Sequence, residues 1–338
     1  MPRAAWPRIV VSCHGLPLGP GICSAFSRLA IAFGEAPLAN SSKIRRTIGA
    51  SFLSMSRPPR SNSPFGWSSR RISSAIGVEV EGVDLSIPLS DRDFQEIRQM
   101  WEESCVLLFR NQTISEDQQV KFAEMFGPLS RTANPERAAA TNSAIMFISN
   151  IRENGRLIGA LPDGEMHFHS DQSYIEKPAT GSMLYAMEIP KLGGNTLFAN
   201  CLASYEDLPL YLKTSLADKQ ALHTYDTTST LRKSGLPIGV KSFSHPVFRT
   251  HPPTRRKAIY VNRLLTHSIV GIPRDESDDI LEQIFDHQEA RQYVYEHQWT
   301  IGDLLLWDNR SCIHARSDFS AQERRLLRRI TLLGEKPH

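Results

Sequence analysis

The second half of the chain is a succession of short β-rich runs, and this pattern limits the folds open to it. Two helices are predicted among these runs, over Ala203–Lys219 and Asp275–His287. Because strands and helices do not alternate regularly, a mainly β sandwich or jelly roll with flanking helices is favoured over a parallel α/β fold. The clearest runs, separated by turns rich in Gly, Pro and Asn, are Ile145–Ile148, Met183–Met187, Thr196–Ala199, Ala258–Val261 and Leu304–Trp307.

The stretch before these runs combines strands with helices. Gly77–Val83 alternates as a strand does, and Val106–Phe109 is typical of a short buried strand. One helix is predicted to begin after Ser90, which is placed as its N-cap. A second is predicted to begin after Ser115, because Gln118 follows at the spacing of a capping box.

The first 71 residues differ in composition from the rest. They contain ten Lys and Arg and one acid, Glu35, so their charge is +9 while that of the remainder is −6. Residues 1–54 are interpreted either as a targeting peptide or as an upstream extension from a wrong start codon, and we favour the second, with Met55 as the first residue. In both cases we expect a disordered leader, with Ser56–Arg71 as a linker, before one domain over residues 72–338.

Composition narrows the functional classes. No apolar run reaches the roughly 18 residues that span a bilayer, so no membrane association is predicted. The positive charge lies in the leader, which argues against nucleic-acid binding by the domain. The five cysteines are scattered and include no Cys-x-x-Cys pair, which argues against disulfides and thiolate zinc sites and favours a cytoplasmic location.

A His-x-Asp motif at His169 and Asp171 carries the first chemical signal. With His314 it supplies two imidazoles and one carboxylate, which can bind one face of an octahedral Fe(II) and leave three positions open. Arg325, eleven residues after His314, is suited to hold the far carboxylate of 2-oxoglutarate through a two-toothed ion pair. Taken alone, the motif is weak, because a single such histidine is more often a hydrogen-bonded core or surface residue.

His167 and the arginine-rich run Glu323–Ile330 lie next to these residues in the sequence, and each allows more than one interpretation. Strand alternation places His167 on the same side as His169 and Asp171, which makes it a competing ligand, although we favour a histidine at the rim. Alternation in Glu323–Ile330 places Arg325, Leu327 and Arg329 on one side of a strand. The remaining two arginines of this run are expected to lie on the surface: Arg324 and Arg328.

Six stretches then follow one another in a recognisable order: FHSDQSY at 168–174, GGNTLFAN at 193–200, HPVFRTHP at 245–252, IYVNR at 259–263, GDLLLWDNRSCIHAR at 302–316 and ERRLLRRITLLGEKP at 323–337. In order and spacing they resemble the TauD/TfdA family of Fe(II)- and 2-oxoglutarate-dependent dioxygenases, over about Ile72 to Pro337. The resemblance implies a double-stranded β-helix, a jelly roll of the cupin type, with flanking helices.

The resemblance also implies an oxidoreductase and the roles of its residues. O2 and 2-oxoglutarate are consumed, succinate and CO2 are released, and a small-molecule substrate is hydroxylated. Asp171 stands where related halogenases have a small residue, so hydroxylation is expected. Family members are often dimers or tetramers, which favours a homo-oligomer. The implied site has Fe(II) ligands at His169, Asp171 and His314, contacts to the distal carboxylate of 2-oxoglutarate at Thr196 and Arg325, and Arg329 near its C1 end and the substrate.

The chain departs from the members that act on taurine. Those members have a His and a Tyr after the Phe-Gly-x-Leu turn, where this chain has residues 130–135, and an Asn at the position of Glu165. Taurine is therefore not expected as the substrate. Arg329 favours a small carboxylate, sulfonate or sulfate instead. The irregular segment Asp226–Ser244 is interpreted either as a mobile lid over the substrate or as a plain surface loop.

Two other functional classes use the same residues. A zinc-dependent hydrolase accepts a His-Asp-His site, but it has no need of the clamp formed by Thr196 and Arg325. A silent β-barrel binding module would be expected to lack at least one of the three ligands, and all three are present. The dioxygenase is therefore the favoured function.

Overall fold

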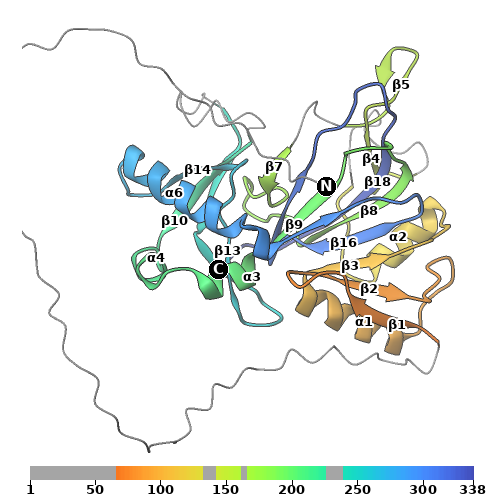
Figure 1. The fold of residues 1–338 in the computed structure, drawn as a ribbon, viewed down its shortest axis with the longest axis horizontal. Helices are drawn as coiled ribbons and strands as arrows, with labels where there is room; N and C mark the ends of the chain where they lie inside the picture. Colours follow the sequence, from red (N-terminus) through yellow and green to blue (C-terminus); the bar gives the residue numbers. More distant parts are fainter. Residues whose placement is uncertain (1–65, 132–141, 161–165, 226–238) are drawn as a thin grey trace, which may run out of the picture. The chain divides into compact units, whose positions relative to one another are not determined.

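The computed structural model describes residues 66–131, 142–160, 166–225 and 239–338, and its largest element is a seven-stranded sheet (Figure 1). Neighbouring strands run antiparallel except for β2 and β3, which pair in parallel. The strands, in spatial order, are β1 (Ser68–Arg71), β2 (Val78–Glu81), β3 (Val106–Phe109), β16 (Leu304–Asp308), β8 (Gly181–Glu188), β18 (Leu326–Leu332) and β4 (Met146–Ser149).

A four-stranded antiparallel sheet packs against one face of the large sheet. Phe198 of the small sheet and Trp307 of the large sheet lie in one buried cluster, with ring centroids 5.6 Å apart. The two sheets therefore share a core, as in a β-sandwich. The strands of the small sheet, in spatial order, are β15 (Val294–His297), β9 (Thr196–Asn200), β17 (Cys312–Arg316) and β7 (Met166–His169).

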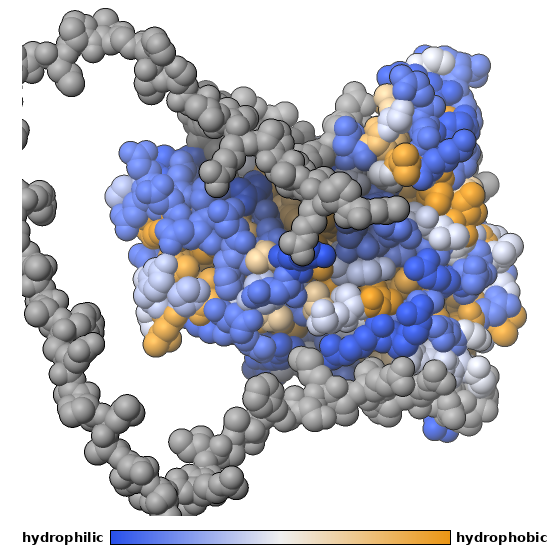
Figure 2. Space-filling view, viewed as in Figure 1, coloured by the Kyte–Doolittle hydropathy of each residue, from blue (hydrophilic) through white to orange (hydrophobic). Residues whose placement is uncertain are grey.

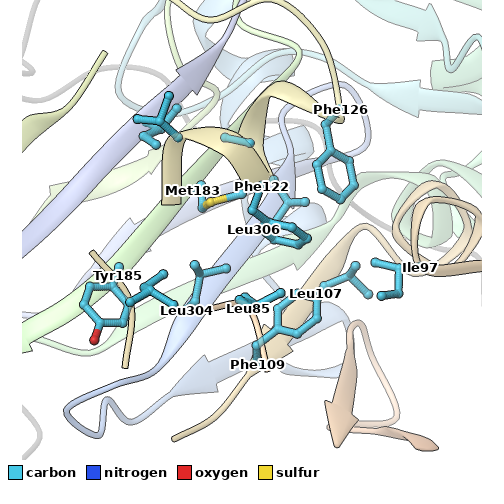
Figure 3. Close-up of a cluster of buried hydrophobic side chains, with 14 of the residues drawn as sticks. Leu85, Ile97, Leu107, Phe109, Phe122, Phe126, Met183, Tyr185, Leu304 and Leu306 are labelled. Carbon is cyan, nitrogen blue, oxygen red and sulfur yellow. The ribbon is translucent and has the colours of Figure 1, made fainter. Parts of the chain in front are cut away.

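Helices α1 (Asp91–Ser104) and α2 (Glu116–Glu124) cover the opposite face of the large sheet. Side chains alternate along β16, so that Leu304 and Leu306 join the cluster beneath the helices (Figure 3) while Leu305 and Trp307 face the small sheet. The predicted N-cap at Ser90 and the predicted capping box of Ser115 and Gln118 are both confirmed.

A third group of elements packs around its own apolar cluster (Figure 1). Its longest helix is α6 (Arg274–Gln288), whose visible face is predominantly hydrophilic (Figure 2). The group also contains α3 (Cys201–Asp207), α4 (Leu210–Ser215), the 3-10 helix η1 (Arg291–Tyr293), the sheet β11-β10-β14 (Ser242–Pro246, Gln220–Thr224, Thr266–Ile269) and the pair β12-β13 (Phe248–Thr250, Lys257–Ile259). A small hairpin, β5 (Arg152–Glu153) and β6 (Arg156–Leu157), completes the described strands.

The single helix predicted over Ala203–Lys219 is wrong, because α3 and α4 are two separate helices there. Pro209 lies between them, and it cannot donate a helical hydrogen bond. It also disfavours helical backbone at the residue before it, and Leu208 is extended, with ψ 137°.

The folded part begins earlier than the sequence predicts. Ser68–Arg71, assigned above to a linker, forms β1 and pairs with β2, and Trp67 before it is buried. The rest of the predicted leader, residues 1–65, lies outside the described residues, as do residues 226–238 of the proposed lid. No helix in the described ranges is long and apolar enough to cross a membrane.

Candidate active site

Two neighbouring strands of the small sheet bring the two predicted ligand histidines together. His169 is the last residue of β7, and its register partner on β17 is His314. Asp171 follows two residues later, and its Oδ1 lies 3.8 Å from Nε2 of His169 and 3.9 Å from Nε2 of His314. All three side chains are buried, and their candidate donor atoms lie within 4.8 Å of one another.

This donor set fits a divalent transition metal. Two imidazole nitrogens and one carboxylate oxygen converge on one point, as the facial arrangement of a non-haem Fe(II) site requires. Burial lowers the pKa of both His169 and His314. Asp171 opposes this, but the charge of Arg329 lowers both pKa values further, and His169 also lowers that of His314. The histidines are therefore neutral, which is the form that binds a metal.

Asp171 is held as a carboxylate by its neighbours. Burial alone would raise the pKa of this carboxyl, but the positive charge of Arg329, together with the neighbouring imidazoles and the hydrogen bond from Ser182, outweighs burial and holds the pKa below its usual range. Ser182 donates to Oδ2 at 2.6 Å, and Arg329 Nη2 lies 2.7 Å from Oδ1. A carboxylate that stays ionised is ready to bind a cation at neutral pH.

Hydrogen bonds also hold the segment after β7, which carries Asp171, and orient the ring of His169. The hydroxyl of Ser170 donates to the carbonyl of Asn309 at 2.9 Å, which ties this segment to the turn after β16. Nδ1 of His169 lies 2.9 Å from the carbonyl of His167; the carbonyl accepts, so Nδ1 carries the proton and Nε2 is left to bind a metal.

These residues line one cavity of about 480 Å³. Thr196 and Arg316 are register partners in its lining, and Arg316 lies close enough to Arg325 for their charges to interact; we call these three residues the cationic end of the cavity. The rest of the wall is largely apolar and aromatic, with Met146, Met166, Leu184, Leu264, Tyr174 and Tyr225. The rings of Tyr174 and Tyr225 are in edge contact, with centroids 4.8 Å apart. Of the described residues around the cavity, Asp171 is the single acid, so cationic side chains outnumber anionic ones.

Arg325 is the most deeply buried cation of this cavity. Its side chain is 2% exposed, and its Nε and Nη1 have no hydrogen-bond partner among the described residues. Burial, and then the charge of Arg316, lower its pKa to about 9. A buried guanidinium with unmet donors is suited to receive a carboxylate.

The chain passes close to Arg325 at a glycine pair. Gly194 has φ +66°, and a Cβ atom there would lie 2.9 Å from Pro190 and 3.4 Å from Nε of Arg325. The backbone therefore requires glycine beside the guanidinium. Thr196 follows at the start of β9, where its hydroxyl accepts a hydrogen bond from the indole of Trp299 at 3.0 Å.

Several predictions about neighbouring residues are now decided by the structure. His167 is exposed, because the register of β7 against β17 shifts after the His169–His314 pair and breaks the alternation. The favoured rim position is thus confirmed. Arg324 is exposed and pairs with Glu188, also as predicted.

The surface position predicted for Arg328 is wrong. Its side chain is buried, Nη2 donates to the carbonyl of Ile114 at 2.7 Å, and the guanidinium lies 4.5 Å from the ring centre of Tyr185. The carbonyl and the aromatic face replace water around the charge. Arg316 also lines the cavity and was not predicted as a site residue, although it follows His314 by two residues on β17, the spacing that returns a side chain to the same face.

Comparison with known proteins decides the family. The model of the taurine catabolism dioxygenase TauD, TfdA family matches residues 68–331. The chain belongs to this family. It is an alpha-ketoglutarate-dependent dioxygenase, an oxidoreductase, which replaces the hydrolase and binding-module alternatives.

Relatives within the TauD/TfdA family match the chain over most of their length. The alpha-ketoglutarate-dependent 2,4-dichlorophenoxyacetate dioxygenase of Cupriavidus pinatubonensis is 31% identical over 277 residues, 76% of this chain and 94% of the relative. Pentalenolactone F synthase of Streptomyces avermitilis is 31% identical over 290 residues, covering 78% and 93%. A solved structure, AAD-2 in complex with Mn(II) and N-oxalylglycine, superposes with TM-score 0.68 at 28% identity and covers 80% of this chain and 98% of that one.

Proposed function

We propose that this dioxygenase hydroxylates a small organic substrate that joins an anionic group to an apolar body. The observation that carries the proposal is the placement of Arg329 in a largely apolar cavity, in direct contact with Asp171. A guanidinium at that point is positioned to bind a carboxylate, sulfonate or sulfate near the metal.

The metal is assigned to His169, Asp171 and His314, and we propose Fe(II) as the ion. When bound with 2-oxoglutarate, Fe(II) supplies the activation of O2 that is coupled to release of succinate and CO2. The chain's own part is to keep both imidazoles neutral and the carboxylate ionised, as the lowered pKa values of all three groups indicate. The Mn(II) of the AAD-2 complex supports a divalent metal in this family.

The co-substrate is assigned to the cationic end of the cavity. Arg325 and the hydroxyl of Thr196 are proposed to bind the distal carboxylate of 2-oxoglutarate, and Arg316 adds a second positive charge there. Because this end lies within the protein, the interaction is weakly screened by solvent. N-oxalylglycine in the AAD-2 complex is a dicarboxylate of similar length, which supports the assignment.

Substrate choice follows from the remaining wall of the cavity. Met146, Met166 and Leu264 present apolar surface, and Tyr174 and Tyr225 present ring edges and faces. Burial and the neighbouring Tyr225 raise the pKa of Tyr174 to about 12, so its neutral hydroxyl does not repel an anion. The Cupriavidus relative acts on a phenoxyacetate, which has the same combination of carboxylate and apolar ring.

The residues that differ from taurine-hydroxylating members support this choice. Ser130 lines the cavity at the turn where those members have other side chains, whereas Glu165 lies outside the described residues. We therefore propose a bulkier substrate than taurine. We further propose that the two facing sheets form the double-stranded β-helix of the family, and that the enzyme is a cytoplasmic homo-oligomer.

The test begins with anaerobic addition of Fe(II) and 2-oxoglutarate to the full chain. We expect a visible charge-transfer band that is absent in His169→Ala and weakened in Arg325→Gln. Arg324→Gln is the matched control, because that exposed neighbour points away from the cavity. Succinate release is then measured with aryloxy and alkyl carboxylates, sulfonates and sulfates. Iron binding without the band, or equal turnover of neutral analogues, would contradict the proposal.

A further inference from the structure

The hydroxyl of Thr196 is oriented by a neighbour outside the cavity's cationic end. Trp299, in the segment after β15, donates its indole N–H to Thr196 Oγ1 at 3.0 Å, and both side chains are buried. A threonine hydroxyl has one hydrogen to donate and two lone pairs to accept. With one lone pair occupied by the indole, the hydrogen points away from Trp299.

The indole packs against a histidine that a buried network of hydrogen bonds holds in place. The ring of Trp299 meets the ring of His297 edge to face, with centroids 4.7 Å apart and planes at 88°. Asp303 Oδ2 lies 3.1 Å from His297 Nε2, and it also accepts from the backbone N–H of Thr300 at 2.9 Å and from Arg110 at 2.9 Å. The carboxylate only accepts, so Nε2 of His297 carries the proton.

The other ring nitrogen of His297 completes this hydrogen-bond network. Its Nδ1 is left to accept from the hydroxyl of Tyr295 at 3.0 Å. His297 and Asp303 are fully buried, so both ends of the imidazole are held without water. The ring that supports Trp299 therefore has one orientation, and the indole N–H has one direction.

We propose that Trp299 is a positioning residue for 2-oxoglutarate, because its indole turns the Thr196 hydroxyl hydrogen toward the distal carboxylate. The inference rests on the proposed role of Thr196 and deepens it. Without the indole, the hydroxyl is free to rotate and to donate elsewhere, and the carboxylate loses a pre-oriented donor. Trp299 lines a separate cavity of about 220 Å³ and is not among the residues that line the active-site cavity, so it acts on the co-substrate through Thr196.

The test measures binding of N-oxalylglycine to the Mn(II)-loaded full chain by calorimetry. Trp299→Phe keeps most of the ring volume and removes the donor, and we expect its Kd to rise about fivefold, the effect of one lost hydrogen bond. Turnover at saturating 2-oxoglutarate stays within about twofold of the original, so the effect lies in KM. Trp101→Phe is the matched control, because the buried indole N–H of Trp101 has no partner in the described part of the chain.

A double-mutant cycle separates orientation from general loosening. Thr196→Val removes the hydroxyl, and in that background Trp299→Phe is expected to change the Kd by less than about 1.5-fold. Full additivity of the two effects, or an unchanged Kd in Trp299→Phe while Arg325→Gln weakens binding, overturns the inference and leaves the proposed function standing. Unchanged binding in both Arg325→Gln and Thr196→Val overturns the proposed co-substrate site and the inference together.

A measurement on the unaltered chain tests the inference even if Trp299→Phe does not fold. The indole 15N–1H resonance of Trp299 is expected to be protected from solvent exchange and to shift when N-oxalylglycine is added to Zn(II)-loaded protein. An indole N–H that exchanges freely, or whose resonance does not move, overturns the inference. The indole of Trp101, which does not line the cavity, is the internal reference.

Discussion

The guanidinium of Arg329 lies 2.7 Å from Oδ1 of Asp171, the same carboxylate oxygen that faces both ligand histidines. A metal ion bound to this oxygen therefore competes with the ion pair and leaves the charge of Arg329 available to another anion. In the proposed function, metal binding and recognition of an anionic substrate are thus linked through one carboxylate.

Replacing Arg329 is expected to have opposite effects on metal and on substrate. In Arg329→Gln, Mn(II) binds more tightly in the absence of other ligands, because a nearby positive charge is removed. KM for an anionic substrate rises about 10- to 100-fold, the range for loss of a hydrogen bond to a charged group. Calorimetry and succinate assays give the two values. If Arg329→Gln weakened the binding of N-oxalylglycine as strongly as that of substrate, Arg329 would instead contact the co-substrate.

Removing Arg316 is expected to weaken the binding of 2-oxoglutarate while its proposed contacts with Arg325 and Thr196 remain. In Arg316→Gln the cationic end of the cavity loses one charge, and KM for 2-oxoglutarate rises about 3- to 10-fold. Because the charge is buried, the ratio to the original enzyme changes little between low and moderate salt. Arg324→Gln, which alters an exposed arginine paired with Glu188, leaves KM unchanged. Equal values in Arg316→Gln and Arg324→Gln would contradict the assignment.

The glycine beside Arg325 gives a prediction for stability and binding together. Gly194→Ala places a Cβ atom 2.9 Å from Pro190 in a backbone with φ +66°. We expect a loss of about 1–3 kcal/mol in the free energy of unfolding and weaker binding of 2-oxoglutarate. Gly155→Ala is the control, because Gly155 has φ +79° but nothing within 4 Å of the added atom. A loss no larger than that of the control would show that the close approach to Arg325 is unimportant.

Two buried histidines away from the metal site predict acid sensitivity. Burial, with a smaller effect of His245, lowers the pKa of His223 to about 3, and burial lowers that of His245 to about 4. In the unfolded chain both titrate near 6.5. Below about pH 6.5 the unfolded state therefore binds protons that the folded state does not, and stability falls as pH falls toward 4. Each histidine contributes at most about 1.4 kcal/mol per pH unit.

Urea denaturation of the metal-free chain at several pH values measures this slope. We expect a shallower slope between pH 6 and 4.5 in His223→Gln than in the original chain. His167→Gln is the control, because it makes the same replacement at an exposed histidine. Identical slopes in the two variants would mean that His223 is protonated in the folded state.

The features that the sequence predicts well depend on nearby residues. The capping box of Ser115 and Gln118 is a local pattern, and it closes as predicted. The strand predicted at Leu304–Trp307 is equally local, because an unbroken apolar run indicates a buried strand, and β16 covers it. Pro209 is a local signal as well, and its effect on the backbone explains why one predicted helix is two.

The features that the sequence does not predict depend on distant partners. The register shift that turns His167 outward arises between β7 and β17, and neither strand shows it alone. Arg328 can be buried because the carbonyl of Ile114 accepts its hydrogen bond and the ring of Tyr185 lies under its guanidinium, and both residues come from other parts of the chain. The indole of Trp299 reaches Thr196 across 103 positions of sequence. A pattern of charges along one segment does not contain these contacts.

The strand order of the two sheets determines when the proposed metal site can form. β16 lies between β3 and β8, and β18 lies between β8 and β4, so the last strands of the chain complete the middle of the sheet. The bond that ties Ser170 to Asn309 joins positions 139 residues apart. During synthesis, His169 and Asp171 are made long before β17, the strand that carries His314 and lies between β9 and β7 in the small sheet. The proposed metal site therefore gains its third ligand only with the C-terminal strands, and a bound metal would mark a chain whose last strands are in place.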